Sequence, residues 1–204
     1  MSGYCQPVEI RAPQGARIAP ATDGGFGQQY QDSLLAGLHV GGVYRFQITD
    51  IPEHPGVEIF PTVELVDRLY PPAGKSLEFP VPIDLSLREL LMAAEGRFIT
   101  RVIYVEDPQF ALPVSEAALK HEPWMEVGPG EDPLVAADSL GRPIAILRMG
   151  GRVPTGNGLD ASFTYGSEPA VIYDRVAPTG RGAERAAPPL APETPAQRLP
   201  VFGQ

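Results

Sequence analysis

Hydrophobic and polar residues alternate with a period of two along much of the chain, a pattern typical of half-buried β-strands. Val, Ile and Leu residues alternate with Glu, Thr and Arg between positions 57 and 69, and a second alternating segment covers 77–85. The intervening segment 70–75 contains two prolines and a glycine, which favour a turn. These segments predict a β-hairpin. We expect its strands to lie at sheet edges or to contain bulges, because three prolines remove backbone donors from them: Pro61, Pro80 and Pro82.

Two helical patterns interrupt this alternation. Ser86 and Glu89 have the spacing of a capping box, and the Leu and Ala residues that follow share one helix face. With Gly96 at its C-terminal end, this segment predicts a helix over about 87–95. A second short helix is predicted over 133–140, where an aspartate and a proline precede the first turn and a glycine follows the last.

The segment 97–106 contains FITRVIYVE, which is apolar at positions of both parities. This pattern is typical of a central strand with both faces covered, so we predict that position for it. Shorter strands are expected at four further segments: 43–51, 144–148, 162–165 and 170–173. The segment 109–130 shows no clear pattern. About eight short strands separated by Gly- and Pro-rich turns predict a mainly β chain, folded as a sandwich or barrel with one or two short helices.

Composition separates a folded part from a tail. The chain has 204 residues, of which 24 are proline and 22 glycine, yet 43% of them are hydrophobic and only 20% are charged. This apolar fraction is enough for a core, so we predict a single β-rich domain over 1–174, with its core region at about 40–174. Positions 175–204 are rich in Pro and Ala and are predicted to be a disordered tail. A few hydrophobic residues near its end, Phe202 among them, give the alternative that the tail docks on a partner.

The N-terminal segment 8–18 has two short alternating stretches around a Pro-Gln-Gly turn at 13–15. We therefore expect an N-terminal hairpin at about 8–22. Together with the Asp-Gly pair at 23–24 and LHVGGVYRF at 38–46, it resembles PEGA-type and related envelope domains. This resemblance implies an immunoglobulin-like or prealbumin-like β-sandwich of the bacterial cell envelope.

The region between 43 and 154 resembles a lineage-restricted, planctomycete-like family of bacterial proteins. The similarity rests on three strings: VELVDRLYPPAG, FITRVIYVEDP and LGRPIAILRMGGRVP. This second resemblance implies no activity, cofactor or substrate.

Charge and cysteine content narrow the classes of partner and compartment. A net charge of −9 and a pI near 4.8 argue against nucleic-acid binding, which needs clustered Lys and Arg. No run of 18 apolar residues is present, so no transmembrane helix is predicted. The single cysteine, Cys5, excludes an internal disulfide. The first residues lack a basic and an apolar region, which predicts a cytoplasmic protein if Met1 is the true start and an exported one, in the periplasm or cell envelope, if a leader has been removed.

Motifs for catalysis and for metal or cofactor binding are incomplete, so we expect no enzyme activity, no cofactor and no metal. The glycine-rich segment 156–161 matches part of a dinucleotide fingerprint, but a strand-like segment follows where the mechanism needs a helix. The three histidines lack ligand spacing, and Cys5 has no activating neighbour in the sequence. Two acidic pairs favour turn or cap roles over glycoside hydrolysis, because each precedes a proline: Glu106-Asp107 and Glu131-Asp132.

Large aromatic side chains in loop-like surroundings are the remaining candidates for a recognition surface. Tyr70 precedes two prolines, Trp124 follows one, and Phe202 lies in the tail. Three hypotheses follow: a non-enzymatic structural or interaction module, in the cell envelope or elsewhere; a carbohydrate-binding or carbohydrate-cleaving β-sandwich; and a subunit of a larger assembly docked through its tail. The expected partner is a protein or an envelope polysaccharide, and the sequence leaves the oligomeric state open.

Overall fold

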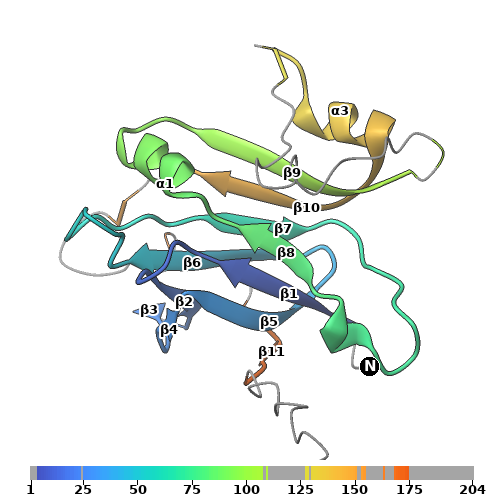
Figure 1. The fold of residues 1–204 in the computed structure, drawn as a ribbon, viewed down its shortest axis with the longest axis horizontal. Helices are drawn as coiled ribbons and strands as arrows, with labels where there is room; N and C mark the ends of the chain where they lie inside the picture. Colours follow the sequence, from blue (N-terminus) through green and yellow to red (C-terminus); the bar gives the residue numbers. More distant parts are fainter. Residues whose placement is uncertain are drawn as a thin grey trace, which may run out of the picture. The chain divides into compact units, whose positions relative to one another are not determined.

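A computed structural model of the chain describes residues 4–23, 25–107, 109, 127–128, 130–150, 153–154, 163 and 168–174. All of these belong to one compact unit, Met1–Asp174. Within the described residues, eleven strands form two sheets and are accompanied by two α-helices (Figure 1). The fold is thus mainly β and has a sandwich-like arrangement, which confirms that part of the expectation.

The smaller sheet has four strands in the order β11-β5-β1-β8. β1 (Cys5–Arg11) lies inside this sheet, antiparallel to β5 (Ser33–His39) and parallel to β8 (Val81–Asp84). The short β11 (Val171–Ile172) pairs with the other side of β5. Periodicity does not reveal β5, because its sequence, SLLAGLH, is apolar at neighbouring positions.

The larger sheet has the order β3-β2-β6-β7-β10-β9, and β4 also pairs with β2. Its strands are β3 (Gly25–Phe26), β2 (Arg17–Thr22), β6 (Val43–Thr49), β7 (Thr62–Leu65), β10 (Gly141–Met149), β9 (Ile99–Glu106) and β4 (Tyr30–Gln31). All neighbouring strands are antiparallel. The β10–β9 register shifts between Pro143 and Ala145. Pro143 has no N–H to donate to the ladder, and such positions favour an irregularity.

The core is one buried cluster to which both sheets contribute alternate side chains. Val8 and Ile10 of β1 belong to it together with Tyr44, Phe46 and Ile48 of β6. This burial settles which face of the 43–51 strand is apolar, as the alternation there left the parity open. Removing this apolar surface from water is the main force that holds the two sheets together.

The predicted N-terminal hairpin at about 8–22 is wrong. Both strands exist, but β1 pairs with β5 and β8, whereas β2 pairs with β6 in the other sheet. The turn itself forms: the Ala16 N–H donates to the Pro13 carbonyl at 3.0 Å, and Gly15 has a φ of 94° that favours glycine. A local turn reverses the chain without choosing the partner strand, and β1 pairs along its whole length with β5 instead.

The predicted hairpin between 57–69 and 77–85 is also wrong. β7 lies inside the larger sheet, and β8 lies at the edge of the smaller one. Pro82 is therefore in an edge strand, as predicted, while Pro61 precedes β7 and leaves its ladder intact. Leu77 and Phe79 are each 49% exposed, because the chain forms a short 3₁₀ helix, η1 (Ser76–Glu78), where alternation predicts a strand.

Both predicted helices are present, as α1 (Leu87–Ala94) and α3 (Pro133–Leu140). The capping box of α1 is complete: the Glu89 N–H donates to the Ser86 hydroxyl at 3.3 Å, and the Ser86 N–H donates to the Glu89 carboxylate at 3.1 Å. Gly96 follows α1 with a φ of 87°. Asp132 caps α3 by accepting from the Leu134 N–H at 2.9 Å.

The predicted central strand at 97–106 occupies a different position. β9 is the last strand of the larger sheet, and among the described residues it pairs with β10 alone. Ile99 and Ile103 pack against the core, and α3 contacts both β9 and β10. Apolar residues at both parities therefore serve the core and the helix, and they do not require a second neighbouring strand.

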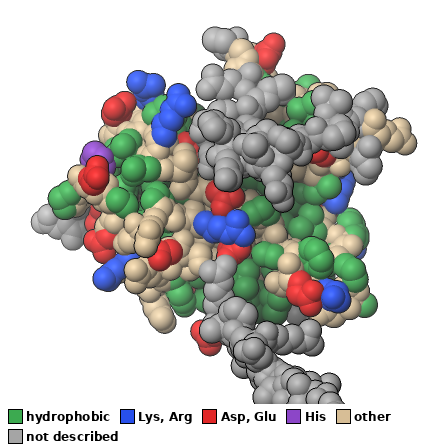
Figure 2. All heavy atoms as spheres, in the orientation of Figure 1, with side chains coloured by type: hydrophobic (Ala, Val, Ile, Leu, Met, Phe, Trp, Pro, Cys, Tyr) green, Lys and Arg blue, Asp and Glu red, His purple; other side chains and the backbone are tan. Residues whose placement is uncertain are grey.

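Acidic and basic side chains form ion pairs at the surface. On the face shown in Figure 2, they lie beside one another among hydrophobic side chains. Arg17 lies 3.1 Å from Asp50 and Arg148 lies 2.7 Å from Glu64, both in pairs that are partly or largely exposed. The net charge of −9 is thus accompanied by many local ion pairs.

Several predictions concern segments that the structure does not describe. The tail at 175–204 lies outside the described residues, as does 110–126. Of the strand predicted at 162–165 only Phe163 is described, and it is buried, whereas the strand predicted at 170–173 contains β11. None of the helices that the structure describes is long and apolar enough to cross a membrane.

Candidate functional site

A groove with a volume of about 600 Å³ follows β9 between α1 and α3. Figure 1 shows β9 as the outermost strand of its sheet, with α1 near its start and α3 near its end. The residues that line the groove include Arg88 and Met92 from α1, Thr100, Val102 and Tyr104 from β9, and Ala136 from α3. Its volume is within the range of about 300–1,000 Å³ that is typical of ligand pockets.

The direction of the β9 backbone groups follows from hydrogen bonds further inside the sheet. On the β6 side, the Gly41 N–H donates to the Leu65 carbonyl at 2.7 Å, and the Leu65 N–H donates to the Gly42 carbonyl at 3.1 Å. Backbone groups of successive residues point to opposite sides of a strand. The backbone groups of Glu64, the residue before Leu65, therefore point toward β10.

The same alternation continues across β10 to β9. Ile146 pairs with Glu64, so the backbone groups of Ile146 point toward β7. The backbone groups of the next residue, Leu147, therefore point toward β9, where Leu147 pairs with Arg101. On β9 the backbone groups of Arg101 point toward β10. Those of the residues with the other parity therefore point away from the sheet: Thr100, Val102 and Tyr104. These three residues also line the groove. The residues that line the groove thus include three whose backbone N–H and C=O groups have no strand partner among the described residues.

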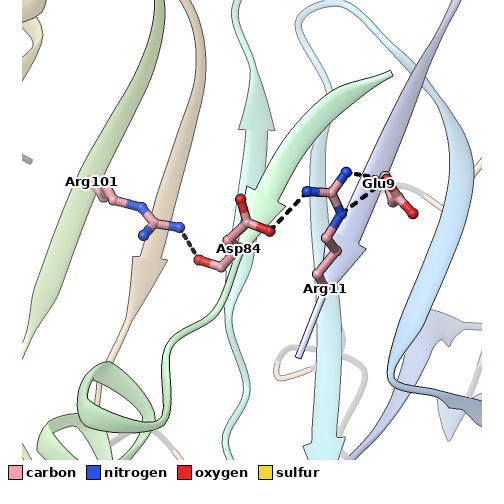
Figure 3. A network of polar contacts seen from close by, with 4 residues as sticks. All are labelled: Glu9, Arg11, Asp84 and Arg101. Carbon is pink, nitrogen blue, oxygen red and sulfur yellow. Dashed lines mark hydrogen bonds and ion pairs between the residues drawn. The ribbon is translucent and has the colours of Figure 1, made fainter. Parts of the chain in front are cut away.

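Arg101 lies at the inner side of the groove and links the two sheets. Its Nη2 donates to the backbone carbonyl of Asp84 at the end of β8, and its Nη1 lies 3.2 Å from Oε1 of Glu89 in α1. The carboxylate of Asp84 accepts from Nη1 of Arg11 at 3.3 Å, and Nη2 of Arg11 donates to Glu9 at 2.6 Å. Figure 3 shows the contacts of Arg101 with Asp84, of Asp84 with Arg11 and of Arg11 with Glu9, which run from β9 across β8 to β1. The network fixes a long side chain that would otherwise be flexible.

Two buried carboxylates hold this network in place. Glu89 is 3% exposed and receives hydrogen bonds from Arg101 and from both the N–H and the hydroxyl of Ser86. Glu9 is 5% exposed and accepts hydrogen bonds from Nε and Nη2 of Arg11. The hydrogen bond to Glu9 is the main cause that raises the pKa of Arg11, against the opposing effect of burial. Both guanidinium groups thus lie beside a buried carboxylate.

Tyr70, a predicted recognition residue, does not line this groove. Its side chain is 68% exposed, but the guanidinium carbons of Arg68 and Arg142 lie 4.7 and 5.3 Å from its ring centroid. Arg68 also lies 4.8 Å from the centroid of the Tyr4 ring. These cation–π contacts explain how a tyrosine ring is held at the surface without burial.

Asp67 completes this cluster of aromatic and charged side chains. It accepts from the Arg68 N–H at 2.8 Å and from Nη1 of Arg142. Burial acts to raise the pKa of Asp67, but these hydrogen bonds and the nearby positive charges outweigh it and hold the pKa below its ordinary value. The carboxylate is thus a structural partner of the two arginines.

The acidic pairs considered for hydrolysis make contacts of turns and caps. Asp132 caps α3, and the Glu131 carboxylate accepts from the Gly128 N–H at 3.0 Å. The Asp107 carboxylate accepts from the Gln109 N–H at 2.9 Å. Among the residues that the structure describes, no three His, Cys, Asp or Glu side chains come together in a way that could hold a metal ion.

Cys5 lies close to Gly37 and Tyr173. A Cβ built on Gly37 would come within 2.4 Å of the Cys5 sulfur, so only glycine leaves room for this packing. Burial raises the pKa of the Cys5 thiol, and its hydrogen bond with Tyr173 opposes this effect only in part. A raised pKa disfavours the nucleophilic thiolate. The other two predicted recognition residues, Trp124 and Phe202, lie outside the described residues.

Periodicity in the sequence does not locate the groove. It places the 97–106 segment at the centre of a sheet, where its backbone would be fully paired. One signal does bear on the true arrangement: each of the two predicted helices directly precedes a strand. The local sequence does not say that these two strands are neighbours at a sheet edge.

Comparison of the chain with known protein families, with curated proteins and with solved structures found no match.

Proposed function

We propose that this protein is a non-enzymatic interaction module that binds an extended segment of a partner protein along β9. The observation that carries the proposal is the row of outward backbone groups at Thr100, Val102 and Tyr104, in a groove between two helices. A strand edge of this kind pairs with an added strand, since each backbone group that leaves water gains a hydrogen bond.

The dimensions of the groove suit such a ligand. β9 has eight residues and is about 26 Å long at roughly 3.3 Å per residue. An added strand alternates its side chains, so one set would face the side of β9 on which Arg101 contacts α1, and the other set the side on which α3 packs. Phe98, which is 74% exposed at the α1 end of the groove, supplies an aromatic surface of the kind that anchors partners.

Carbohydrate binding has weaker support. The ring of Tyr70 is contacted by two guanidinium groups, which compete with a sugar for the same aromatic surface. Strand addition, in contrast, uses a surface whose backbone groups lack a strand partner among the described residues. It is also independent of compartment, since backbone pairing works in the cytoplasm and in the cell envelope alike.

A displayed library of random decapeptides, selected on the full chain, tests this function. We expect selected peptides to slow the amide exchange of Thr100, Val102 and Tyr104. Val102→Pro removes one outward donor without removing a bond to β10, so it should weaken peptide binding at least tenfold. The matched control is Ala73→Pro, which places the same residue in the exposed turn that ends with the Lys75 N–H donating to the Pro72 carbonyl.

Unchanged binding by Val102→Pro, or protection of amides elsewhere only, would contradict the proposal. If Val102→Pro does not fold, the same test is made on the peptide. Each selected peptide is then made in two forms, with N-methyl groups either at its odd or at its even residues. One of the two forms should bind the wild-type protein at least tenfold more weakly than the unmethylated peptide.

A further inference from the structure

The groove along β9 differs in chemistry between its two ends. The end at α1 contains Arg88, Arg97 and Arg101, with Glu89 as the one carboxylate in the lining. The end at α3 is apolar and is formed by residues such as Pro133, Ala136 and Leu140. A ligand that fills the groove therefore meets positive charge at one end and hydrocarbon at the other.

From this polarity we infer that the groove binds a partner segment with acidic side chains beside the start of β9 and apolar side chains beside its end. This inference rests on the proposed function and adds the chemistry of the partner. Carboxylates match guanidinium groups in charge and in hydrogen-bond geometry. Apolar side chains gain by leaving water at the α3 end.

The three arginines have different roles in this recognition. Arg101 is held by Glu89 and by the carbonyl of Asp84, so its charge is already neutralised and its position is fixed. Arg97 pairs with Glu95 at 3.5 Å, and both side chains are about two-thirds exposed (66% and 64%). Such an exposed pair contributes little, and a peptide carboxylate can replace it at small cost. Arg88 and Arg97 are both exposed and line the groove, and we assign the recognition of the acidic side chains to them.

The charged side chains that line the groove are mostly basic, whereas the chain as a whole is acidic. The whole chain has a net charge of −9, whereas the groove lining has three arginines and one glutamate. An acidic segment is thus disfavoured over most of the surface and favoured here, which gives specificity by repulsion elsewhere as well as by local attraction.

Paired peptides and charge variants test the inference. A selected decapeptide with two or more Asp or Glu residues is compared with its Asn or Gln counterpart, each with a free and with an amidated C-terminus. We expect the acidic peptide to bind wild-type protein about five- to tenfold more tightly, as two exposed charge pairs allow. In Arg88→Gln/Arg97→Gln the difference should fall to within about twofold. Arg17→Gln/Lys75→Gln changes the net charge equally, at two exposed residues that do not line the groove, and should keep the preference.

The outcomes separate this inference from the proposed function. Peptides that bind in a manner sensitive to Val102→Pro but without an acidic preference would overturn the inference alone. A preference for the free C-terminus in place of acidic side chains would overturn the assignment to side chains. Concentration-dependent dimerisation that Val102→Pro abolishes would identify a second copy of the chain as the occupant, which also overturns it. Failure of every peptide to bind would overturn the proposed function itself.

Discussion

The side chain of Glu89 connects three parts of the fold. It caps α1 through Ser86, and it holds Arg101 of β9, which in turn reaches the end of β8. Its spacing from Ser86 predicts the cap from the sequence alone, because a capping box is a local motif. Its contact with Arg101, in contrast, depends on where β9 lies and has no local signal. One residue thus has a predictable role and an unpredictable one.

Glu89→Gln should lower the free energy of unfolding by about 3 kcal/mol, because it leaves Arg101 without its countercharge in a mostly buried position. Urea unfolding followed by far-UV circular dichroism measures the change. The control is Glu78→Gln, which removes the carboxylate of an exposed pair with Lys75 at 3.2 Å and should cost less than about 1 kcal/mol. Equal losses in the two variants would show that the Glu89–Arg101 contact has no special weight.

Asp67 gives a prediction that depends on pH. Its pKa is lowered in the folded state, so its contribution to stability is present above the unfolded pKa of about 3.9 and is lost as the pH falls through the folded pKa. Asp67→Asn should therefore destabilise the protein at pH 7, by at most about 1 kcal/mol because the pair is partly exposed. Once the pH has fallen below the folded pKa of Asp67, the variant and wild type should become equally stable. A difference as large in acid as at pH 7 would contradict the assigned role of the carboxylate.

At the scale of elements, β9 illustrates why an apolar strand is not always a central one. Its sequence is apolar at both parities, and both faces are in fact used, one by the core and the other by helix packing. The hydrogen-bonding edge is a third surface, perpendicular to those two, and side-chain periodicity carries no information about it. That the outer edge of β9 has no strand partner among the described residues is consequently a feature that the sequence pattern does not predict.

Amide exchange distinguishes the two sides of β9. In the free protein, the amides of Thr100, Val102 and Tyr104 should exchange at least tenfold faster than those of Arg101 and Ile103, which point toward β10. Nuclear magnetic resonance resolves the exchange of single residues and can measure this alternation. Uniform protection along β9 would mean that its outer edge is covered in solution, and it would remove the basis of the proposed function.

At the scale of the whole molecule, strand partners are mostly chosen across long stretches of sequence. β1 and β2 follow one another yet belong to different sheets, and β1 pairs in parallel with β8, more than 70 residues later. Each strand pairs where its apolar face completes the common core, which no short window of sequence can specify. Both predicted hairpins fail for this reason, although the Pro13–Gly15 turn is correctly placed.

The sequence by itself determined the mainly β class, both helices with their caps, and the turn at Gly15. These features depend on neighbouring residues, whose periodicity and capping chemistry act over a few positions. Only the tertiary structure decided the strand order, the edge position of β9 and the groove with its basic and apolar ends. Those features depend on which distant segments share a core, and the free energy of that choice belongs to the assembled sheets and not to any single segment.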